Sequence, residues 1–388
     1  ARLQVGQLMQ EIVFTNAEIV LADRTMRGSL QVRDGRIAQV DAGPSRAAGA
    51  IDCGGDLLLP GLIELHTDNM ERHIMPRPKT FWPIEAAVLN HDREVAAAGI
   101  TTVLDALSLG FSEGGEMRGR LIQDFVPALD RHVAAGALKA DHLLHLRCEV
   151  SSESMLRQLD GLIDHPAVRL VSFMDHTPGQ RQFVDFGAFK TYYMGKWAMK
   201  EDEFAEFVEK RVASAKQFSE PNRRATVKRA HARGIKVASH DDATLPHVEE
   251  AKRDGIAIAE FPTTFEAAAA SHEAGMAVLM GGPNIVRGGS HSGNVAARDL
   301  AARGHLDIVS SDYVPSSLLY GALLLESQID GISLAQAVAT VTLNPARAVG
   351  LEDRGEIATG KRADLIRVNR AGAVPVVRDV WRGGGKIA

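Results

Sequence analysis

The stretch GLIELHTDNMERH, residues 61 to 73, ends an apolar run with groups that bind protons or metal ions. It follows the apolar residues Leu57 to Pro60, and its own strand-like part ends in His66 and Asp68. Residues two apart on a β-strand point to the same side, so these two side chains can reach one common ligand. An imidazole beside a carboxylate at a strand end predicts a metal or catalytic site.

Seven further apolar runs follow before residue 341, and a helical stretch separates each run from the next. Strands that alternate with helices are typical of βα units in a parallel sheet. Eight such strands predict an α/β fold, a closed (β/α)8 TIM-like barrel whose active site lies at the C-terminal strand ends. The expected strands are 62–68, 100–107, 142–150, 168–176, 235–242, 256–262, 277–284 and 306–313.

The two ends of the chain have a different pattern. Residues 11–59 and 355–388 contain short alternating segments separated by Gly and Asp turns, which is typical of a small antiparallel β unit. We therefore expect one small β-sandwich domain built from both termini, residues 1–60 and 342–388. The barrel domain would then span residues 61–341.

The composition limits the classes of partner and the cellular location that we expect for this protein. The 388 residues include 44 Lys and Arg against 49 Asp and Glu, so the net charge of -5 gives no reason to expect nucleic acid or an anionic membrane as partner. No window approaches the 18 or more apolar residues of a spanning helix, and Cys53 and Cys148 lack CxxC spacing. We expect a cytoplasmic protein in which any anion site is local.

Ionisable residues recur where the other predicted strands end. They are Glu149, Asp175 and His176, His240, Asp241 and Asp242, Glu260, and Asp312. These ends converge in a barrel, and buried charges are costly unless they are paired or bind a metal. Mixed imidazole and carboxylate ligands favour one or two divalent ions, Zn, Mn or Fe, and Glu149 could bridge two. A single histidine deeper in a strand is more often structural, and we expect this of His145.

Two loops contain groups that bind anions. Residues 281–294, GGPNIVRGGSHSGN, combine glycine amides with Asn284, Arg287, Ser290 and His291, which can wrap phosphate oxygens. The long connection 177–224 carries Arg181, Lys190 and Lys196 among aromatic residues. The structural alternatives are a flexible crossover for the first loop and a solvated excursion for the second.

Several motifs, read in order, resemble one known group of enzymes. LPGLIELHTD, LHLRCE, MDHTPGQRQF, ASHDDAT, MGGPNIVRGGSHSGN and SSDYVPSSLL resemble the amidohydrolase superfamily of metal-dependent hydrolases. From about residue 10 to the end, the chain is most similar to its α-D-ribose 1-methylphosphonate 5-triphosphate diphosphatase branch, which belongs to the carbon-phosphorus lyase pathway. The resemblance implies hydrolysis of an anionic sugar triphosphate to a 5-phosphate and pyrophosphate, and a homo-oligomeric enzyme.

The resemblance also implies roles for individual residues. His66 and Asp68 match the metal pair of the first strand, and Glu149 matches a bridging carboxylate. His240 matches the fifth-strand ligand, and Asp312 the eighth-strand ligand and general base, so both are catalytic candidates. His176 or Asp175 would complete the metal shell. The chain has HxD where the superfamily usually has HxH, and Glu260 where many members have His, which leaves the last ligand and the number of ions open.

Two other functions remain open at this point. Hydrolysis of a cyclic amide or an N-acetyl group is common in the superfamily, but a neutral amide does not need the Arg and Lys residues of the long connection. A non-catalytic scaffold relative would be expected to have lost ligands, whereas His66, Asp68, Glu149, His240 and Asp312 are all present.

Overall fold

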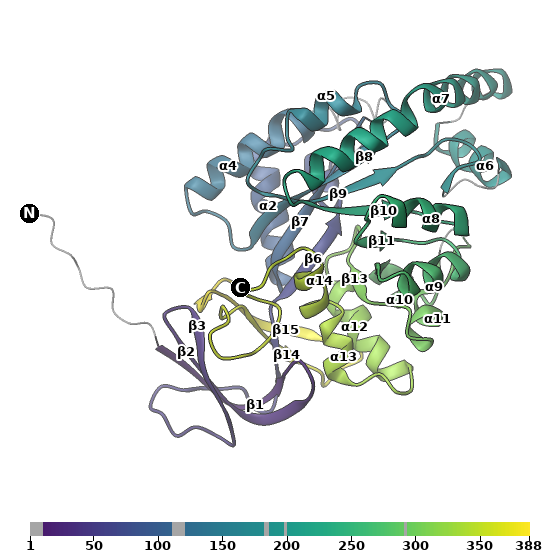
Figure 1. Ribbon diagram of the computed structural model, residues 1–388. Coiled ribbons are helices and arrows are strands. Elements are labelled where there is room, and N and C mark those ends of the chain that lie inside the picture. Colours follow the sequence, from purple (N-terminus) through teal and green to yellow (C-terminus); the bar gives the residue numbers. More distant parts are fainter. Residues whose placement is uncertain (1–10, 111–120, 182–185, 198–199, 291–292) are drawn as a thin grey trace, which may run out of the picture.

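The computed structural model describes residues 11–110, 121–181, 186–197, 200–290 and 293–388, and its strands form two eight-stranded sheets (Figure 1). The parallel sheet consists of β6 (Leu62–Thr67), β7 (Ile100–Leu109), β8 (Asp141–Glu149), β9 (Val168–Met174), β10 (Lys236–His240), β11 (Ile258–Glu260), β12 (Ala277–Gly281) and β13 (Ile308–Ser310). Each strand pairs with the next one in the sequence. A single parallel bridge between Thr67 and Asp312 joins the first strand to the last. All eight expected strands are confirmed, and they form a nearly closed barrel.

One apolar cluster fills the barrel below its C-terminal end. Its buried members on the strands are Ile63, Leu65, Leu104, Leu170, Ala238, Ile258, Leu279 and Ile308, and Leu143 of β8 packs against them. Ala346 of helix α14 and Val349, directly after that helix, belong to the same cluster. Because this part of the interior is closed by aliphatic side chains, the polar groups of the strands gather at the other end of the barrel.

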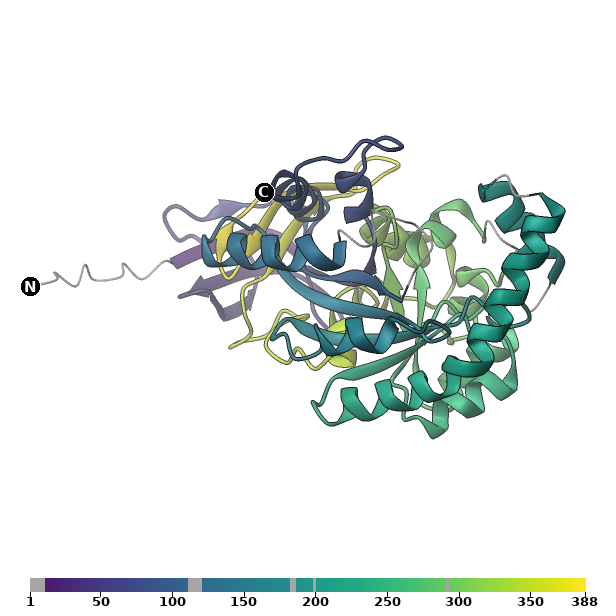
Figure 2. The ribbon, with the colours of Figure 1, turned by 90° about the horizontal axis from the view of Figure 1, so that it is seen from above.

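Helices surround the barrel, as the view from above shows (Figure 2). They are α1 (Met70–Ile74), α2 (Ile84–Ala97), the π-helical turn η1 (Leu121–Phe125), α4 (Val126–Ala134), α5 (Met155–Asp160), α6 (Phe186–Trp197), α7 (Glu201–His231), α8 (Leu245–Arg253), α9 (Phe265–Glu273), α10 (Gly282–Arg287), α11 (Ala297–Ala302), α12 (Ser317–Gln328), α13 (Leu334–Ala339) and α14 (Leu343–Ala348). The buried positions of α2 recur every three to four residues, which is the spacing of a helix with one buried face. Within the described ranges, no helix has both the length and the apolar character needed to cross a bilayer.

The long connection after β9 is largely helical. Helix α6 packs on the start of α7 through Phe189, Tyr193 and Phe204, which form a small apolar cluster of their own. In both views these helices lie at the end of the molecule away from the second sheet (Figures 1 and 2).

The second sheet combines both ends of the chain. Its strands are β1 (Glu11–Val20), β2 (Thr25–Arg33), β3 (Arg36–Ala42), β4 (Ile51–Asp52), β5 (Leu57–Pro60), β14 (Leu365–Asn369), β15 (Val376–Arg382) and β16 (Gly385–Lys386). Strand β14 pairs with β5, which leads directly into the first barrel strand. The sheet is mixed and not purely antiparallel as expected, because β1 runs parallel to β4 and β5. Phe14 of β1 meets Trp381 of β15 edge to face in its core, with ring centroids 4.8 Å apart.

Candidate metal centre

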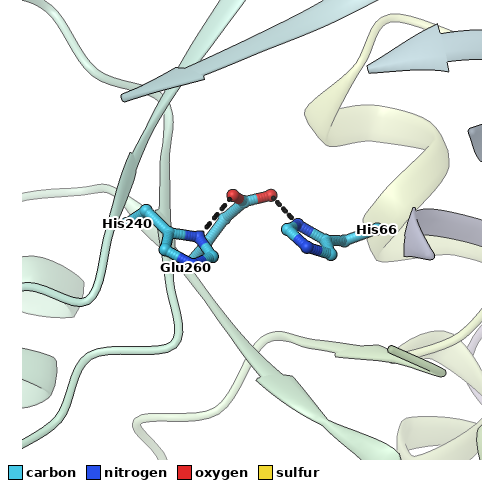
Figure 3. Close-up of side chains that lie close together, drawn as sticks. All are labelled: His66, His240 and Glu260. Atoms are coloured by element: carbon cyan, nitrogen blue, oxygen red, sulfur yellow. Dashed lines mark hydrogen bonds and ion pairs between the residues drawn. The ribbon is translucent and has the colours of Figure 1, made fainter. Parts of the chain in front are cut away.

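Glu260 lies between two histidines at the C-terminal end of the barrel (Figure 3). Its Oε1 is 3.3 Å from Nδ1 of His66, and its Oε2 is 3.3 Å from Nδ1 of His240. The three residues come from β6, β11 and β10, and all are buried. The three offer ligand atoms that lie within 4.8 Å of one another. Two imidazoles and one carboxylate are a donor set that suits Zn, Mn or Fe.

Both histidines of this group are neutral near pH 7. Burial, helped by the positive charge of Arg147, holds the pKa of His66 well below its ordinary value. Burial is also the main cause that lowers the pKa of His240 to about 3. A metal binds the neutral imidazole, so these side chains are in the form that a ligand requires. The chemistry of the donors therefore fits a divalent ion.

A second imidazole and carboxylate pair lies at the ends of β8 and β9. Nδ1 of His176 is 2.6 Å from Oε2 of Glu149. The other carboxylate oxygen, Oε1, accepts hydrogen bonds from the His176 backbone N–H at 3.2 Å and the Ser151 hydroxyl at 2.6 Å. Burial raises the pKa of Glu149, but His176, Arg211 and Ser151 together more than offset this effect, so the pKa is lowered overall. This carboxylate is therefore ionised and held in one orientation.

Asp312 follows β13 and completes the polar end of the barrel. Burial raises its pKa to about 7, and the negative charge of Asp68 adds to the effect. Arg147 acts in the opposite direction, and its Nη1 is 3.9 Å from Oδ2 of Asp68. Burial likewise raises the pKa of Asp241 to about 6. A carboxylate with a pKa near 7 can accept and release protons under neutral conditions.

Two of these carboxylates have a backbone conformation that favours glycine. The φ angle is 54° at Asp312 and 57° at Asp241, and it is 50° at Phe261, directly after Glu260. Such strain persists only where the surroundings hold it, and it is common at functional sites. Here it occurs at the ends of three barrel strands, next to the candidate metal ligands.

Four of the six predicted metal residues are therefore brought together in two groups, while Asp68 lies beside Arg147 and Asp312 lies after β13. His66 and His240 lie with Glu260, and Glu149 lies with His176. Asp175, the alternative to His176, is directed elsewhere, because its carboxylate accepts hydrogen bonds at 3.0 Å from the Thr177 backbone N–H and the Ser219 hydroxyl. His145 has the structural contacts expected of it, to the Leu65 carbonyl at 3.0 Å and the Ser172 hydroxyl at 2.7 Å.

The residues expected to bind phosphate are more scattered. Arg181 is buried and forms ion pairs with Asp242 and with Glu250, the latter at 2.6 Å. Lys190 pairs with Glu201 at 2.7 Å. Asn284 holds its own loop, because its amide donates to the Val295 carbonyl at 3.1 Å and accepts from the Ala297 N–H at 2.9 Å.

The remaining predicted phosphate ligands lie on α6 and after β12. Arg287 is exposed at the end of α10, and Ser290 is partly buried. Lys196 belongs to α6, and His291 lies outside the described residues.

Sequence reasoning missed Arg147 and Glu64. Arg147 is two residues before Glu149, so strand alternation places both on the inner face of β8 and would have been a signal for it. Glu64 is two residues before His66 and is fully buried. It accepts a hydrogen bond from the His66 backbone N–H at 2.6 Å.

A buried polar cluster between α2 and the outer face of the barrel was also missed. Nε2 of His91 is 2.7 Å from Oδ1 of Asp105, and Nδ1 of His142 is 2.8 Å from Oδ2 of the same carboxylate. Nε2 of His142 faces Asp92 at 3.3 Å. Burial lowers the pKa of His142, but Asp105 and Asp92 outweigh burial and raise it to about 9. A protonated imidazole is a poor metal ligand, so we interpret this cluster as a structural ion pair.

Comparison with known proteins places the chain in one family. A model described as the amidohydrolase family matches residues 57–384. The chain is 46% identical over 377 residues to the α-D-ribose 1-methylphosphonate 5-triphosphate diphosphatase of Escherichia coli (strain K12), and the match covers 97% of this chain and 100% of that protein.

Solved structures share the fold at much lower identity. One is 5-methylcytosine deaminase from Klebsiella pneumoniae with bound phosphonocytosine, at a TM-score of 0.63 and 18% identity over 98% of each chain. Another is a variant of N-acetyl-D-glucosamine-6-phosphate deacetylase from Mycobacterium smegmatis, at a TM-score of 0.62 and 17% identity over 97% of this chain and 98% of that one. The resemblance found in the motifs is thereby confirmed along nearly the whole sequence, and the chain belongs to the amidohydrolase family of hydrolases.

Proposed function

We propose that this protein hydrolyses α-D-ribose 1-methylphosphonate 5-triphosphate to the 5-phosphate and pyrophosphate, with one or two divalent ions as cofactor. The observation that carries the proposal is the 46% identity to the Escherichia coli diphosphatase over 97% of this chain and 100% of that protein. The cytoplasmic location and the homo-oligomeric state expected from the sequence remain predictions.

The proposal assigns the metal ligands to the two groups at the barrel end. His66, His240 and Glu260 would hold one ion, and Glu149 with His176 would hold a second. Asp68 and Asp312, at the ends of β6 and β13, would contribute further oxygens. When bound, such ions act as Lewis acids, lower the pKa of water and neutralise developing negative charge.

The chain supplies the proton acceptor. In the proposed reaction, water attacks the α-phosphorus while Asp312 accepts a proton from it, and the bond from that phosphorus to the oxygen leading to the β-phosphorus breaks. Pyrophosphate leaves with that oxygen. A general base works best when its pKa is close to the working pH, and the pKa of Asp312 is raised to about 7.

Arg147 is the cation best placed to meet the substrate inside the barrel. Its side chain is only 12% exposed and lies beside Asp68. Among the described residues, its Nε has no hydrogen-bond partner. An arginine with a free donor suits a phosphate oxygen, because its planar fork can donate to two oxygens at once. Phosphoryl transfer depends mainly on such positioning and charge neutralisation.

The decisive experiment is an assay of pyrophosphate release by protein of known metal content. The ribose 1-methylphosphonate 5-triphosphate would be compared with ATP, GTP and a dihydropyrimidine amide. We expect rapid release from the first compound, lost with a chelator and restored by added metal. Turnover of the amide alone would instead establish the general amide chemistry of the family, and no turnover by metal-loaded protein would favour a scaffold.

A further inference from the structure

At the metal end of the barrel, side chains close the gap between the first and last strands. Deeper in the barrel, the backbone of residues 340–341 bridges these strands, because the Val309 N–H donates to the Thr340 carbonyl at 3.0 Å and the Ile63 N–H donates to the Val341 carbonyl at 2.9 Å. Strands β6 and β13 stand at the two ends of the parallel sheet, and one bridge, Thr67 to Asp312, joins them. Elsewhere in the sheet, neighbouring strands share at least three paired positions. We call the junction between β6 and β13 the seam. The metal ligand candidates His66 and Asp312 lie on opposite sides of it, so at this level their separation depends on side-chain contacts across the seam.

Glu64 crosses the seam at this level. The side chain is fully buried, and its carboxylate has three donors. Oε1 accepts from the His66 backbone N–H at 2.6 Å and from the Ser310 hydroxyl at 2.7 Å. Oε2 accepts from the Ser311 backbone N–H at 2.5 Å. One carboxylate therefore connects the backbone next to both ligand candidates.

Ser310 and Thr67 extend this connection. The Ser310 hydroxyl also lies 2.6 Å from the His66 carbonyl oxygen and 3.3 Å from the Asp312 backbone N–H. The Thr67 hydroxyl donates to the Asp312 carbonyl oxygen at 2.6 Å. Asp312 has a φ of 54°, a conformation that an L-residue adopts only when its neighbours hold it. These contacts fix that turn against the first strand.

We infer that Glu64 is a positioning residue, which holds His66 and Asp312 in register across the seam so that they can bind metal. It is too deeply buried to touch a substrate, and it acts through the two backbone segments to which it is bonded. The inference depends on the metal centre of the proposed function but not on the identity of the substrate.

The test replaces Glu64 by glutamine. Glu64→Gln keeps the shape of the side chain, but its amide nitrogen must face a backbone N–H, either that of Ser311 or that of His66. We expect the Kd for Mn²⁺, measured without substrate by competition with a chelator, to weaken by about 10- to 100-fold. The kcat of metal-saturated enzyme should fall more than KM changes. Ser310→Ala, a smaller perturbation of the same seam, should shift the Kd in the same direction.

Asp364→Asn is the matched control. Asp364 is also a buried carboxylate that accepts a backbone N–H, from Gly383 at 2.7 Å, but it lies in the mixed-sheet region. This variant should lose stability and keep the wild-type Kd. An unchanged Kd in folded Glu64→Gln overturns the inference, and if that variant does not fold, an unchanged Kd in Ser310→Ala does so. Because no substrate enters this measurement, an incorrect substrate assignment would leave its result standing.

Discussion

Nδ1 of His176 and Oε2 of Glu149 are 2.6 Å apart. Whether this pair binds an ion decides whether the protein holds one or two ions per chain. If the pair belongs to a second ion site, His176→Asn should remove one of two ions per chain and reduce activity by at least about tenfold. Metal content measured by mass spectrometry would show this. Asp175→Asn is the control, because Asp175 is bonded to Thr177 and Ser219 and should leave the metal content unchanged. Retention of both ions by His176→Asn would argue against the second site.

Asp312→Asn should reduce kcat by about 10²- to 10⁴-fold, because the amide cannot accept the proton from water. Asp312 must be ionised to accept that proton, so wild-type kcat/KM should fall at low pH as this carboxylate becomes protonated. The variant should lack this acid limb. Turnover close to the wild-type rate at unchanged metal content would exclude Asp312 as the base.

Arg147→Met should raise the KM for the triphosphate by about 10- to 100-fold, the usual effect of losing hydrogen bonds to a charged group. Arg147 also lowers the pKa of Asp312, so its removal should move the acid limb of the pH profile to higher pH. Arg147→Lys keeps the positive charge but loses the planar guanidinium group. This variant should therefore have an acid limb close to that of the wild type, while its KM remains raised. If KM and the limb are both unchanged in Arg147→Met, the residue does not act in the site.

Arg181 and Arg287 were both expected to bind phosphate, and the structure distinguishes them. Arg181→Met leaves Asp242 buried without its partner, so the free energy of unfolding should fall by about 3–5 kcal/mol. Arg287 is exposed, and Arg287→Met should leave stability unchanged. Urea denaturation of the two variants tests this contrast. A stable Arg181→Met enzyme with a raised KM would instead support a direct contact with substrate.

The ion pair of His142 and Asp105 makes stability depend on pH. The pKa of His142 is raised to about 9 in the folded protein, against about 6.5 in the unfolded chain. Its contribution is therefore complete below about pH 6.5 and is lost as the pH rises toward 9, by about 3 kcal/mol. Denaturant unfolding at pH 6 and pH 9.5 should show this decrease in the wild type and not in His142→Gln. Equal decreases in both proteins would assign the pH dependence to other groups.

The sequence predicted the barrel well because its strand pattern is local. Each of the eight expected strands exists, since an apolar run followed by a helix can be recognised within a short window. The parallel pairing of β1 with β5 was not predicted. That pairing depends on how separate segments of the chain are arranged in space. An alternating apolar pattern predicts a strand, but it does not indicate whether the strand runs parallel or antiparallel to its neighbour.

The candidate site was only partly predictable for the same reason. His66 and His240 are at strand ends, where the barrel brings them together. The place of Glu260 between them follows from the register of β10 and β11, in which His240 and Glu260 are paired positions. Arg181 was expected to bind phosphate, but in the folded protein its charge is neutralised by ion pairs with Asp242 and Glu250.

The mixed sheet can be completed only late in the synthesis of the chain. Strand β5 leaves the ribosome early, yet its neighbour β14 is synthesised only after the entire barrel. During translation β5 therefore has one unpaired edge until residues 365–369 have been synthesised. A premature stop shortly before residue 365 would release a chain that has every barrel strand and an open, aggregation-prone β5 edge.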